Sequence, residues 1–227
     1  MGEMVSYASD AGGSEGYLAL PENGGPGVVV IQEWWGLVSH ITSLADRFAA
    51  AGYVALAPDL YHGVQATEPD EARRLLMGLA MDRAGQEIAG AADYLAGLPQ
   101  TRGDGIAAVG FCMGGSLALW SATLSDRIRV AVGFYPAIPW ERMQPRWDNY
   151  TGKTAVIHCA ESDGTSAAAG IQTAKAAIES GGGSCTLYDY PGTKHAFFND
   201  DRPEVYDTAA AASAWARTID AIRSQLG

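Results

Sequence analysis

Short apolar runs alternate with longer amphipathic segments along most of the chain. Brief apolar runs bounded by Gly, Pro or Asp are typical of buried strands. They lie at residues 28–32, 54–57, 106–110, 130–134, 155–159 and 185–190. The segments between them predict helices at residues 41–51, 70–79, 84–98, 113–124, 165–180 and 203–226. This alternation predicts a mostly parallel central sheet with helices on both faces, the α/β class.

The two ends of this pattern carry additional signals. Residues 4–7 and 16–20 alternate weakly around a turn rich in Gly, Ser and Asp, which predicts an antiparallel hairpin. Pro203 stands where a helix can begin. The longest irregular stretch, residues 137–154, is rich in Trp, Pro and Arg, and we expect it to overhang the sheet. Because no linker or long insertion interrupts the pattern, the sequence predicts one domain over residues 1–227, without a separate lid domain.

Composition narrows the range of partners. The chain has 26 acidic and 15 basic residues, a net charge of −11, and no run of Lys or Arg, which argues against a nucleic-acid partner. No apolar stretch is long enough to span a membrane, and the N-terminus lacks the pattern of a secretory signal. We therefore expect a cytoplasmic protein, a monomer or small homo-oligomer, that acts on a small molecule. The three cysteines match no metal-binding spacing, and no cofactor motif is present, so no metal or cofactor is expected.

The strongest chemical signal is the sequence GFCMGG at residues 110–115. It follows a predicted strand and opens a predicted helix, the context of a nucleophile elbow with the pattern G-x-[S/C]-x-G. The turn is tight and strained, which explains its glycines. It would hold the sulfur of Cys112 at the carboxyl end of the sheet, where the helix dipole and a nearby imidazole favour a thiolate. The alternative is a buried structural cysteine in a Gly-rich turn.

A thiol nucleophile needs a base, and His195 is the best of four histidines. It lies after the last predicted strand and before the last predicted helix, where the catalytic histidine of this arrangement stands. His158 lies inside an apolar strand and is expected in the core. His40 and His62 lie in early loops, where a position at the surface or at the rim of a pocket is expected.

The acid and the oxyanion donors are predicted from their places at strand ends. An acid should follow the next-to-last strand, where Asp163 begins a turn and Glu161 is the alternative. Asp before Gly is also a common turn residue or helix cap, so a structural role for Asp163 stays open. The backbone N–H groups of Met113, after the nucleophile, and of Trp34, after an early strand, are the candidate oxyanion donors.

Taken together, these motifs resemble the dienelactone hydrolase family, a cysteine branch of the α/β hydrolases. The resemblance is carried by QEWWG at 32–36, PDLY at 58–61, GFCMGG at 110–115, Asp163, and KHAF at 194–197. It covers nearly the whole chain. It implies the α/β-hydrolase fold and a Cys-His-Asp triad that opens a small ester or lactone through an acyl-enzyme.

The resemblance also implies a role for Glu33. In the family, a glutamate at this place contacts the resting cysteine, holds the sulfur as a poorly reactive thiol, and helps to form the thiolate when substrate arrives. The alternative is a strand-end carboxylate that backbone N–H groups satisfy.

Substrate recognition departs from the family. Family enzymes that act on dienelactone bind its carboxylate with arginines, one of them four residues after the catalytic histidine; here that residue is Asn199, and Arg202 lies three residues further on. A second arginine finds no clear counterpart among Arg73, Arg74 and Arg83. Recognition of a carboxylate is therefore open. The aromatic residues that could wall an apolar pocket, each of which could equally pack in the core, are Trp34, Trp35, Tyr61, Phe111, Tyr135 and Phe197.

Two other functions compete with hydrolysis of an ester. A thiol amidotransferase-like enzyme also uses G-x-C-x-G, but such proteins place Glu just after the catalytic histidine, where this chain has Ala196 and Phe197. A non-catalytic pseudo-hydrolase could serve as a binding or scaffold module. The presence of Cys, acid and His at matched positions argues against it.

Overall fold

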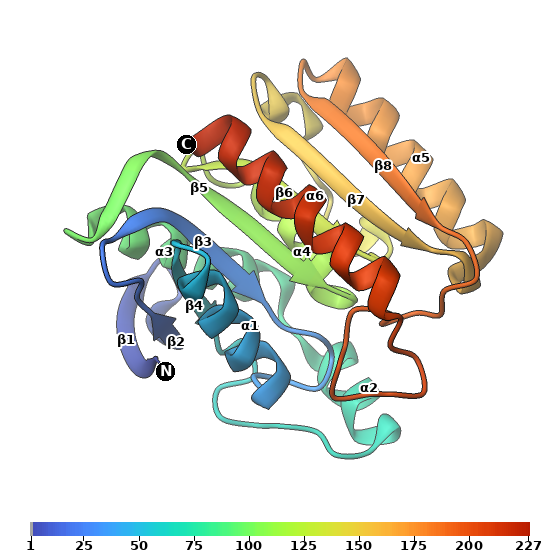
Figure 1. Ribbon diagram of the computed structural model, residues 1–227, viewed down its shortest axis with the longest axis horizontal. Helices are drawn as coiled ribbons and strands as arrows, with labels where there is room; N and C mark the ends of the chain where they lie inside the picture. The colour runs from blue at the N-terminus through green and yellow to red at the C-terminus, as the bar shows by residue number, and fades with distance from the viewer. Residues whose placement is uncertain (1) are drawn as a thin grey trace.

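One twisted sheet forms the centre of the protein. The computed structural model describes residues 2–227, apart from the side chain of residue 166. The sheet has eight strands in the order β1-β2-β4-β3-β5-β6-β7-β8 (Figure 1). The strands are β1 (Glu3–Ser9), β2 (Gly12–Ala19), β3 (Gly25–Ile31), β4 (Val54–Pro58), β5 (Thr101–Phe111), β6 (Ile128–Phe134), β7 (Thr154–Ala160) and β8 (Ser184–Tyr190). All strand pairs from β4 to β8 are parallel, whereas β2 is antiparallel to β1 and β4, so the predicted hairpin and parallel sheet are both confirmed.

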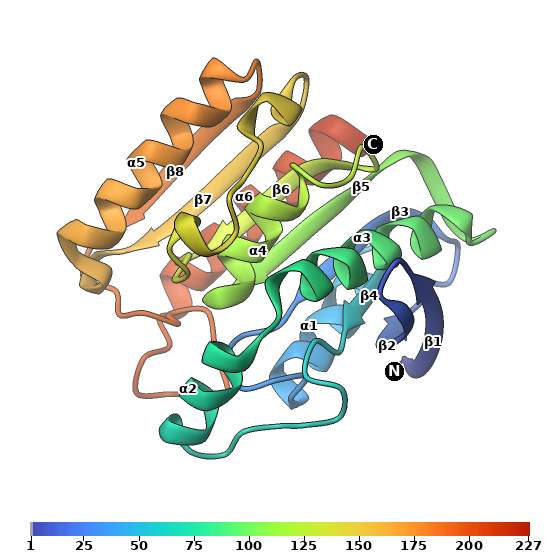
Figure 2. The same ribbon diagram turned by 180° about the vertical axis from the view of Figure 1, so that it is seen from behind.

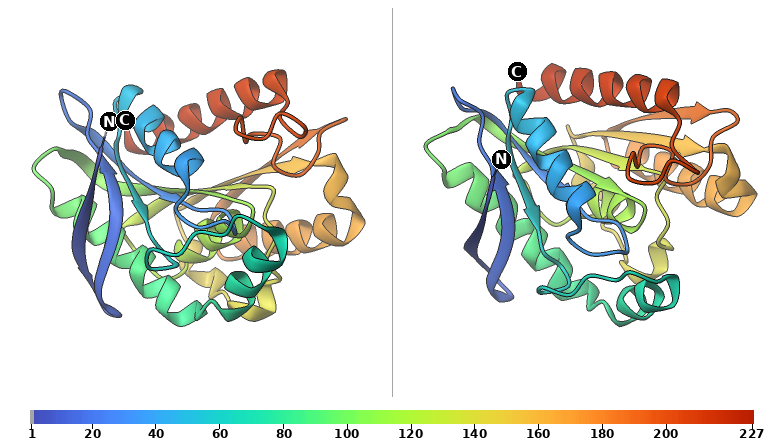
Figure 3. Two further views of the ribbon diagram at one scale, coloured as in Figure 1. Left: turned by 90° about the horizontal axis from the view of Figure 1, so that it is seen from below. Right: turned by 60° about the horizontal axis from the view of Figure 1, so that its bottom comes forward.

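Helices cover both faces of the sheet. On one face lie α1 (Ser39–Ala50) and α6 (Thr208–Leu226), which are in front in Figure 1. The other face carries α3 (Met81–Gly97), α4 (Met113–Ser121) and α5 (Gly164–Ser180), which are in front in Figure 2. The short helix α2 (Pro69–Gly78) leads into α3. Seen along the sheet, the strands lie between these two helical layers, and residues 2–227 form no separate lid domain (Figure 3).

The strands are apolar on both sides because both sides are covered. In β3, Val28 and Val30 point into the core under α1 and α6, while Val29 and Ile31 point into the core under α3 and α4. All four side chains are fully buried. Successive side chains of a strand point to opposite faces of the sheet. A strand that is covered on both faces is therefore apolar at every position, as is typical of parallel strands inside an α/β fold.

The last helix begins later than the sequence predicts. A start at Pro203 is wrong: α6 begins at Thr208. The carbonyl of Arg202 accepts hydrogen bonds from Val205 and Tyr206, which folds residues 202–206 into a turn. The Asp207 side chain then accepts a 2.8 Å hydrogen bond from the N–H of Ala210, which makes Asp207 the N-cap.

The irregular stretch after β6 packs on helices. It contains two short 3-10 turns, η1 (Trp140–Arg142) and η2 (Trp147–Tyr150). The indole N–H of Trp140 donates to the carbonyl of Gly170 in α5 at 2.9 Å. Within the described part of the chain, no helix has the length and apolar content needed to cross a membrane.

Candidate active site

Cys112 lies at the sharp turn between β5 and α4. Its backbone has φ 55° and ψ −116°, in a region that side-chain-bearing residues rarely adopt. Backbone hydrogen bonds hold this conformation: the N–H of Cys112 donates to Phe134 at 3.0 Å, and its carbonyl accepts from Gly115 at 3.0 Å and Ala137 at 3.2 Å. The turn is therefore strained but fixed on both sides, as a nucleophile elbow requires.

The glycines around Cys112 are required by the packing. A Cβ on Gly110 would overlap the carbonyl oxygen of Gly114, and a Cβ on Gly115 would lie 2.6 Å from the carbonyl oxygen of Phe134. A Cβ on Gly114 would lie 2.5 Å from the carbonyl oxygen of Gln32. Since real Cβ atoms are not found so close to backbone oxygens, only glycine fits at the three positions.

His195 contacts Asp163 and lies beside Cys112. Its Nδ1 lies 2.8 Å from Oδ1 of Asp163. Burial alone would lower the pKa of His195. Its interactions with Asp163 and Cys112 outweigh burial and raise the pKa of His195 to about 10. The ring of Tyr135 packs against the imidazole with centroids 4.9 Å apart.

Two adjoining loops place the acid beside the imidazole. Ser162 accepts a 2.7 Å hydrogen bond from the N–H of His195, and its own N–H donates to Thr193. Glu161 accepts a hydrogen bond from the N–H of Gly192 at 2.8 Å. Of the two candidate acids, Asp163 therefore reaches the imidazole, whereas Glu161 fastens the loop. Ser162 was not predicted from the sequence, where its place beside Asp163 is the only signal of a role.

The carboxylate of Asp163 does not act as a helix cap in the part of α5 that the structure describes. Asp163 directly precedes α5, yet no side-chain capping bond forms there. Asp before Gly also permits a structural role in a turn or a helix cap, but here the carboxylate is hydrogen-bonded to His195 instead.

Glu33 is buried beside this cluster. Its side chain is 1% exposed, and its Oε2 accepts a 2.9 Å hydrogen bond from the amide of Asn199. Its other oxygen, Oε1, has no hydrogen-bond partner in the described structure. The partner of Glu33 is thus a side chain rather than the backbone N–H groups of the structural alternative. Burial is the main cause that raises the pKa of Tyr135 well above its usual value, and the nearby charge of Glu33 is the second.

The two candidate oxyanion donors lie at adjacent strand ends. Met113 is the first residue of α4, so its N–H has no partner within the helix. Trp34 follows β3 by three residues. Because Gly114 packs directly against the carbonyl oxygens of Ile31 and Gln32, the start of α4 and the end of β3 are held together.

Three of the proposed pocket aromatics lie in the core. Phe111 is 1% exposed and stacks on Phe134 with centroids 4.6 Å apart, and Phe197 and Tyr135 are fully buried. The burial of these three rings favours the alternative that they pack in the core, and a role in a substrate pocket stays a prediction. Phe197 is buried because the loop after His195 turns inward and packs on the sheet.

The other proposed substrate contacts are partly exposed, except for Tyr61, which is buried. Trp34 and Trp35 are half-buried, with rings 5.2 Å apart. Tyr61 donates from its hydroxyl to the sulfur of Met113 at 3.3 Å, directly beside the nucleophile. Arg202 instead forms an ion pair with Glu204 at 3.0 Å.

The remaining histidines occupy three different environments. His158 is buried in β7, as expected, with Tyr190 and Thr218 as side-chain partners at 2.8 and 3.1 Å. His62 is 44% exposed and lies 2.8 Å from the buried Glu87. His40 is buried behind Phe111, so a place at the surface was wrong for it. Among the described residues, no group of three or more His, Cys, Asp or Glu side chains could hold a metal ion.

Comparisons with known proteins agree on one family. A family model described as "Dienelactone hydrolase family" matches residues 14–226. The chain is 33% identical to "Protein usf" of Aquifex pyrophilus, with 96% of each chain covered. It is 29% identical over the full length of both chains to an Aquifex aeolicus (strain VF5) protein that carries the provisional name carboxymethylenebutenolidase. The fold is similar to that of a dienelactone hydrolase-like promiscuous phosphotriesterase, P91, from metagenomic libraries, with a TM-score of 0.82, 21% identity, and coverage of 100% of this chain and 99% of that one.

Proposed function

Because the chain belongs to the dienelactone hydrolase family, we propose that it hydrolyses a small carboxylic ester or lactone with Cys112 as the nucleophile. Family membership makes the protein a hydrolase of the ester and lactone class. The nucleophile, the triad and the acyl-enzyme are our proposal. One observation carries it: the imidazole of His195 is hydrogen-bonded to Asp163 and lies close enough to Cys112 for the two groups to interact.

The proposed reaction has two halves. The Cys112 thiolate attacks the carbonyl carbon, and the backbone N–H groups of Trp34 and Met113 stabilise the negative oxygen that forms. The imidazolium of His195 then protonates the leaving alkoxide, which leaves a thioester on Cys112. In the second half, His195 removes a proton from water, the hydroxide attacks the thioester, and the carboxylic acid leaves while the sulfur returns to its starting state.

The other polar residues act through His195 and Cys112. Asp163 holds Nδ1 of His195, so that the other ring nitrogen faces the sulfur. Asp163 also helps to raise the pKa of His195, which favours the protonated imidazole that the first half of the reaction requires. We propose that Glu33 adjusts the protonation of Cys112 before substrate binds. The free oxygen of its buried carboxylate is the atom available for that contact.

Substitution of the triad tests the proposal directly. Cys112→Ala should abolish turnover of an activated aryl ester such as p-nitrophenyl acetate, with an unchanged circular dichroism spectrum. His195→Ala should lose on the order of 10³-fold or more in kcat. Cys159 packs on the opposite face of the sheet from Cys112, so the Cys159→Ala protein should retain activity. Full activity of the Cys112→Ala protein would end the proposal.

The reactivity of the three thiols separates an enzyme from a scaffold. Burial raises the pKa of Cys159 to about 12 and that of Cys185 to about 11, which makes both thiols poorly reactive near neutral pH. We expect iodoacetamide to label Cys112 much faster than the other two, as mass spectrometry of a labelling time course would show. Equally slow labelling of all three would favour a non-catalytic scaffold.

A further inference from the structure

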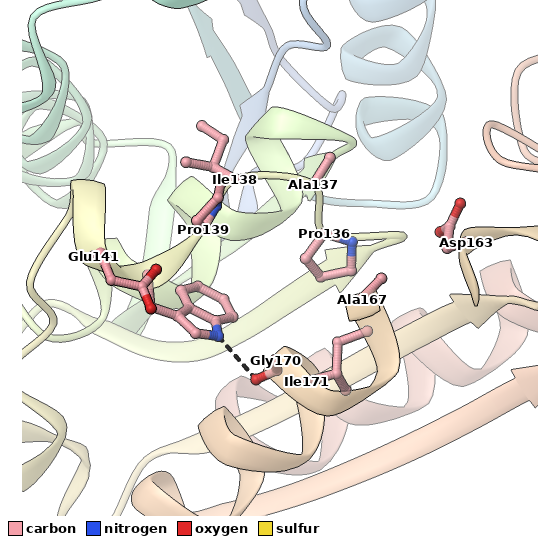
Figure 4. Close-up of a pocket in the computed structure, with 10 residues that line it drawn as sticks. Pro136, Ala137, Ile138, Pro139, Glu141, Asp163, Ala167, Gly170 and Ile171 are labelled. Atoms are coloured by element: carbon pink, nitrogen blue, oxygen red, sulfur yellow. Dashed lines mark hydrogen bonds between the residues drawn. The ribbon is translucent and has the colours of Figure 1, made fainter. Parts of the chain in front are cut away.

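A cavity of about 530 Å³ lies next to the triad acid. Its walls are residues 136–141 of the loop after β6 and the side of α5 that carries Ala167, Gly170 and Ile171, with Asp163 at one end (Figure 4). This volume lies within the range of about 300–1,000 Å³ that is usual for small-molecule pockets.

The cavity adjoins the reacting groups through two separate contacts. Asp163, which lines it, is the hydrogen-bond partner of His195. Ala137, which also lines it, donates its N–H to the carbonyl of Cys112 at 3.2 Å. Cys112 and His195 are not among the described residues that line the cavity, so a substrate attacked at the sulfur of Cys112 would reach this space past Asp163 or Ala137.

Most side chains that line the cavity are apolar, although its exposed surface is divided about evenly between polar and apolar atoms. Pro136, Ala137, Ile138 and Pro139 form one side, and Ala167 and Ile171 form the other (Figure 4). The indole N–H of Trp140 already donates to the carbonyl of Gly170, so the ring offers the cavity no free hydrogen-bond donor.

The charges of the cavity are negative. Among its lining residues that the structure describes, the charged side chains are Asp163 and Glu141, and no Lys or Arg is present. The next residue, Arg142, directs its guanidinium to the carbonyl of Leu76 in α2 at 3.3 and 3.4 Å. An anionic group in the cavity would thus meet Glu141 and the carboxylate of Asp163, which is already paired with His195, and no Lys or Arg among the described lining residues.

We propose that this cavity is the subsite for an uncharged, apolar acyl chain, so that the enzyme prefers neutral esters or lactones to those that carry a carboxylate. The inference rests on the proposed function, because it assumes that Cys112 attacks the substrate. It departs from the recognition of a carboxylate by arginines that the family resemblance implies.

Three matched substrates test the charge preference. They are the p-nitrophenyl esters of pentanoate, of glutarate with one free carboxylate, and of 4-(trimethylammonio)butanoate, which share one leaving group. We expect kcat/KM for pentanoate to exceed both others by about tenfold or more, because a charge buried without a partner is costly. Equal or faster hydrolysis of the glutarate ester would overturn the proposal. A preference for the cationic ester would overturn it too, since Glu141 would then serve to bind a cation.

A pair of variants on α5 tests the location. Ala167→Leu adds methyl groups inside the cavity, whereas Ala169→Leu adds them on the exposed side of the same helix. In the Ala167→Leu protein, we expect the ratio of kcat/KM for pentanoate to that for acetate to fall about tenfold, because the longer chain loses its apolar site. In the Ala169→Leu protein the ratio should equal that of the wild type.

The outcomes separate this inference from the proposed function. If hydrolysis of all esters depends on Cys112 but Ala167→Leu leaves the pentanoate-to-acetate ratio unchanged, the assignment of the cavity is wrong and the proposed function stands. If the Cys112→Ala protein hydrolyses the esters as fast as wild type, the proposed function itself is wrong.

Discussion

The buried imidazole of His158 should make the fold sensitive to acid. His158 lies in β7 between Tyr190 and Thr218 and is fully buried. Burial, with a smaller contribution from the positive charge of Arg217, lowers the pKa of His158 to about 3. We propose to replace His158 by Gln, whose amide can still exchange hydrogen bonds with the two hydroxyl groups but does not titrate.

The size of the effect follows from the two pKa values of His158. In the unfolded chain the pKa is about 6.5, so below that pH the unfolded state binds a proton that the native state does not. The stabilisation is therefore fully present above pH 6.5 and is lost as the pH falls towards 3. The slope is about 1.4 kcal/mol per pH unit, which amounts to roughly 2 kcal/mol between pH 6.5 and pH 5.

Urea denaturation at about pH 6.5, 6 and 5 measures this contribution. The free energy of unfolding of the wild type should fall by roughly 2 kcal/mol more than that of the His158→Gln protein between pH 6.5 and pH 5. His62→Gln is the matched control, because His62 is 44% exposed, and this variant should retain the contribution of His158. Parallel pH dependence of the wild type and the His158→Gln protein would refute the reasoning.

Two further predictions concern the stability of single elements. Gly114→Ala places a Cβ against the carbonyl oxygens of Ile31 and Gln32 and should lower the free energy of unfolding, measured by urea denaturation, by about 3 kcal/mol or more. Gly97→Ala is the control, because a Cβ there meets nothing within 4 Å, and it should be neutral or slightly stabilising. Equal stability of the two variants would contradict the packing argument. Asp207→Ala removes the N-cap of α6 and should lower the free energy of unfolding by about 1 kcal/mol. Pro203→Ala, five residues before the helix, should leave the stability nearly unchanged. A larger loss for Pro203→Ala than for Asp207→Ala would indicate that the helix begins at Pro203.

The sheet and the nucleophile turn could be predicted because their signals are local. Short apolar runs such as residues 28–32 mark buried strands, and the glycines at positions 110, 114 and 115 mark a turn that admits no Cβ. The order nucleophile, acid and histidine predicted Cys112, Asp163 and His195 after the carboxyl ends of three parallel strands, which are β5, β7 and β8. Parallel strands bring their carboxyl ends to one edge of the sheet, which is how residues far apart in the chain meet.

The contacts that could not be predicted depend on how loops pack after the sheet has formed. Glu33 and Asn199 are separated by 166 positions, and only the folded loop after His195 brings them together. The same loop turns Phe197 inward, although an aromatic residue beside a catalytic histidine could equally line a pocket. The start of α6 was missed because the side chain of Asp207, not the fixed φ of Pro203, decides where the helix begins.

Backbone strain offers an indication of the site that does not depend on the family motifs. Among the described residues other than glycine, positive φ angles occur at Cys112, Tyr135 and Ala196, and also at His62 and Gln144. The first three follow β5, β6 and the proposed base, so they gather at one edge of the sheet. Such conformations cost on the order of 1–3 kcal/mol each and persist only where neighbouring contacts enforce them. Two backbone hydrogen bonds enforce them here: the N–H of Cys112 donates to the carbonyl of Phe134, and the N–H of Tyr135 donates to the carbonyl of His158. The first bond positions the sulfur, and the second positions the ring that packs on His195. Strain and chemistry therefore point to the same edge of the sheet for separate physical reasons.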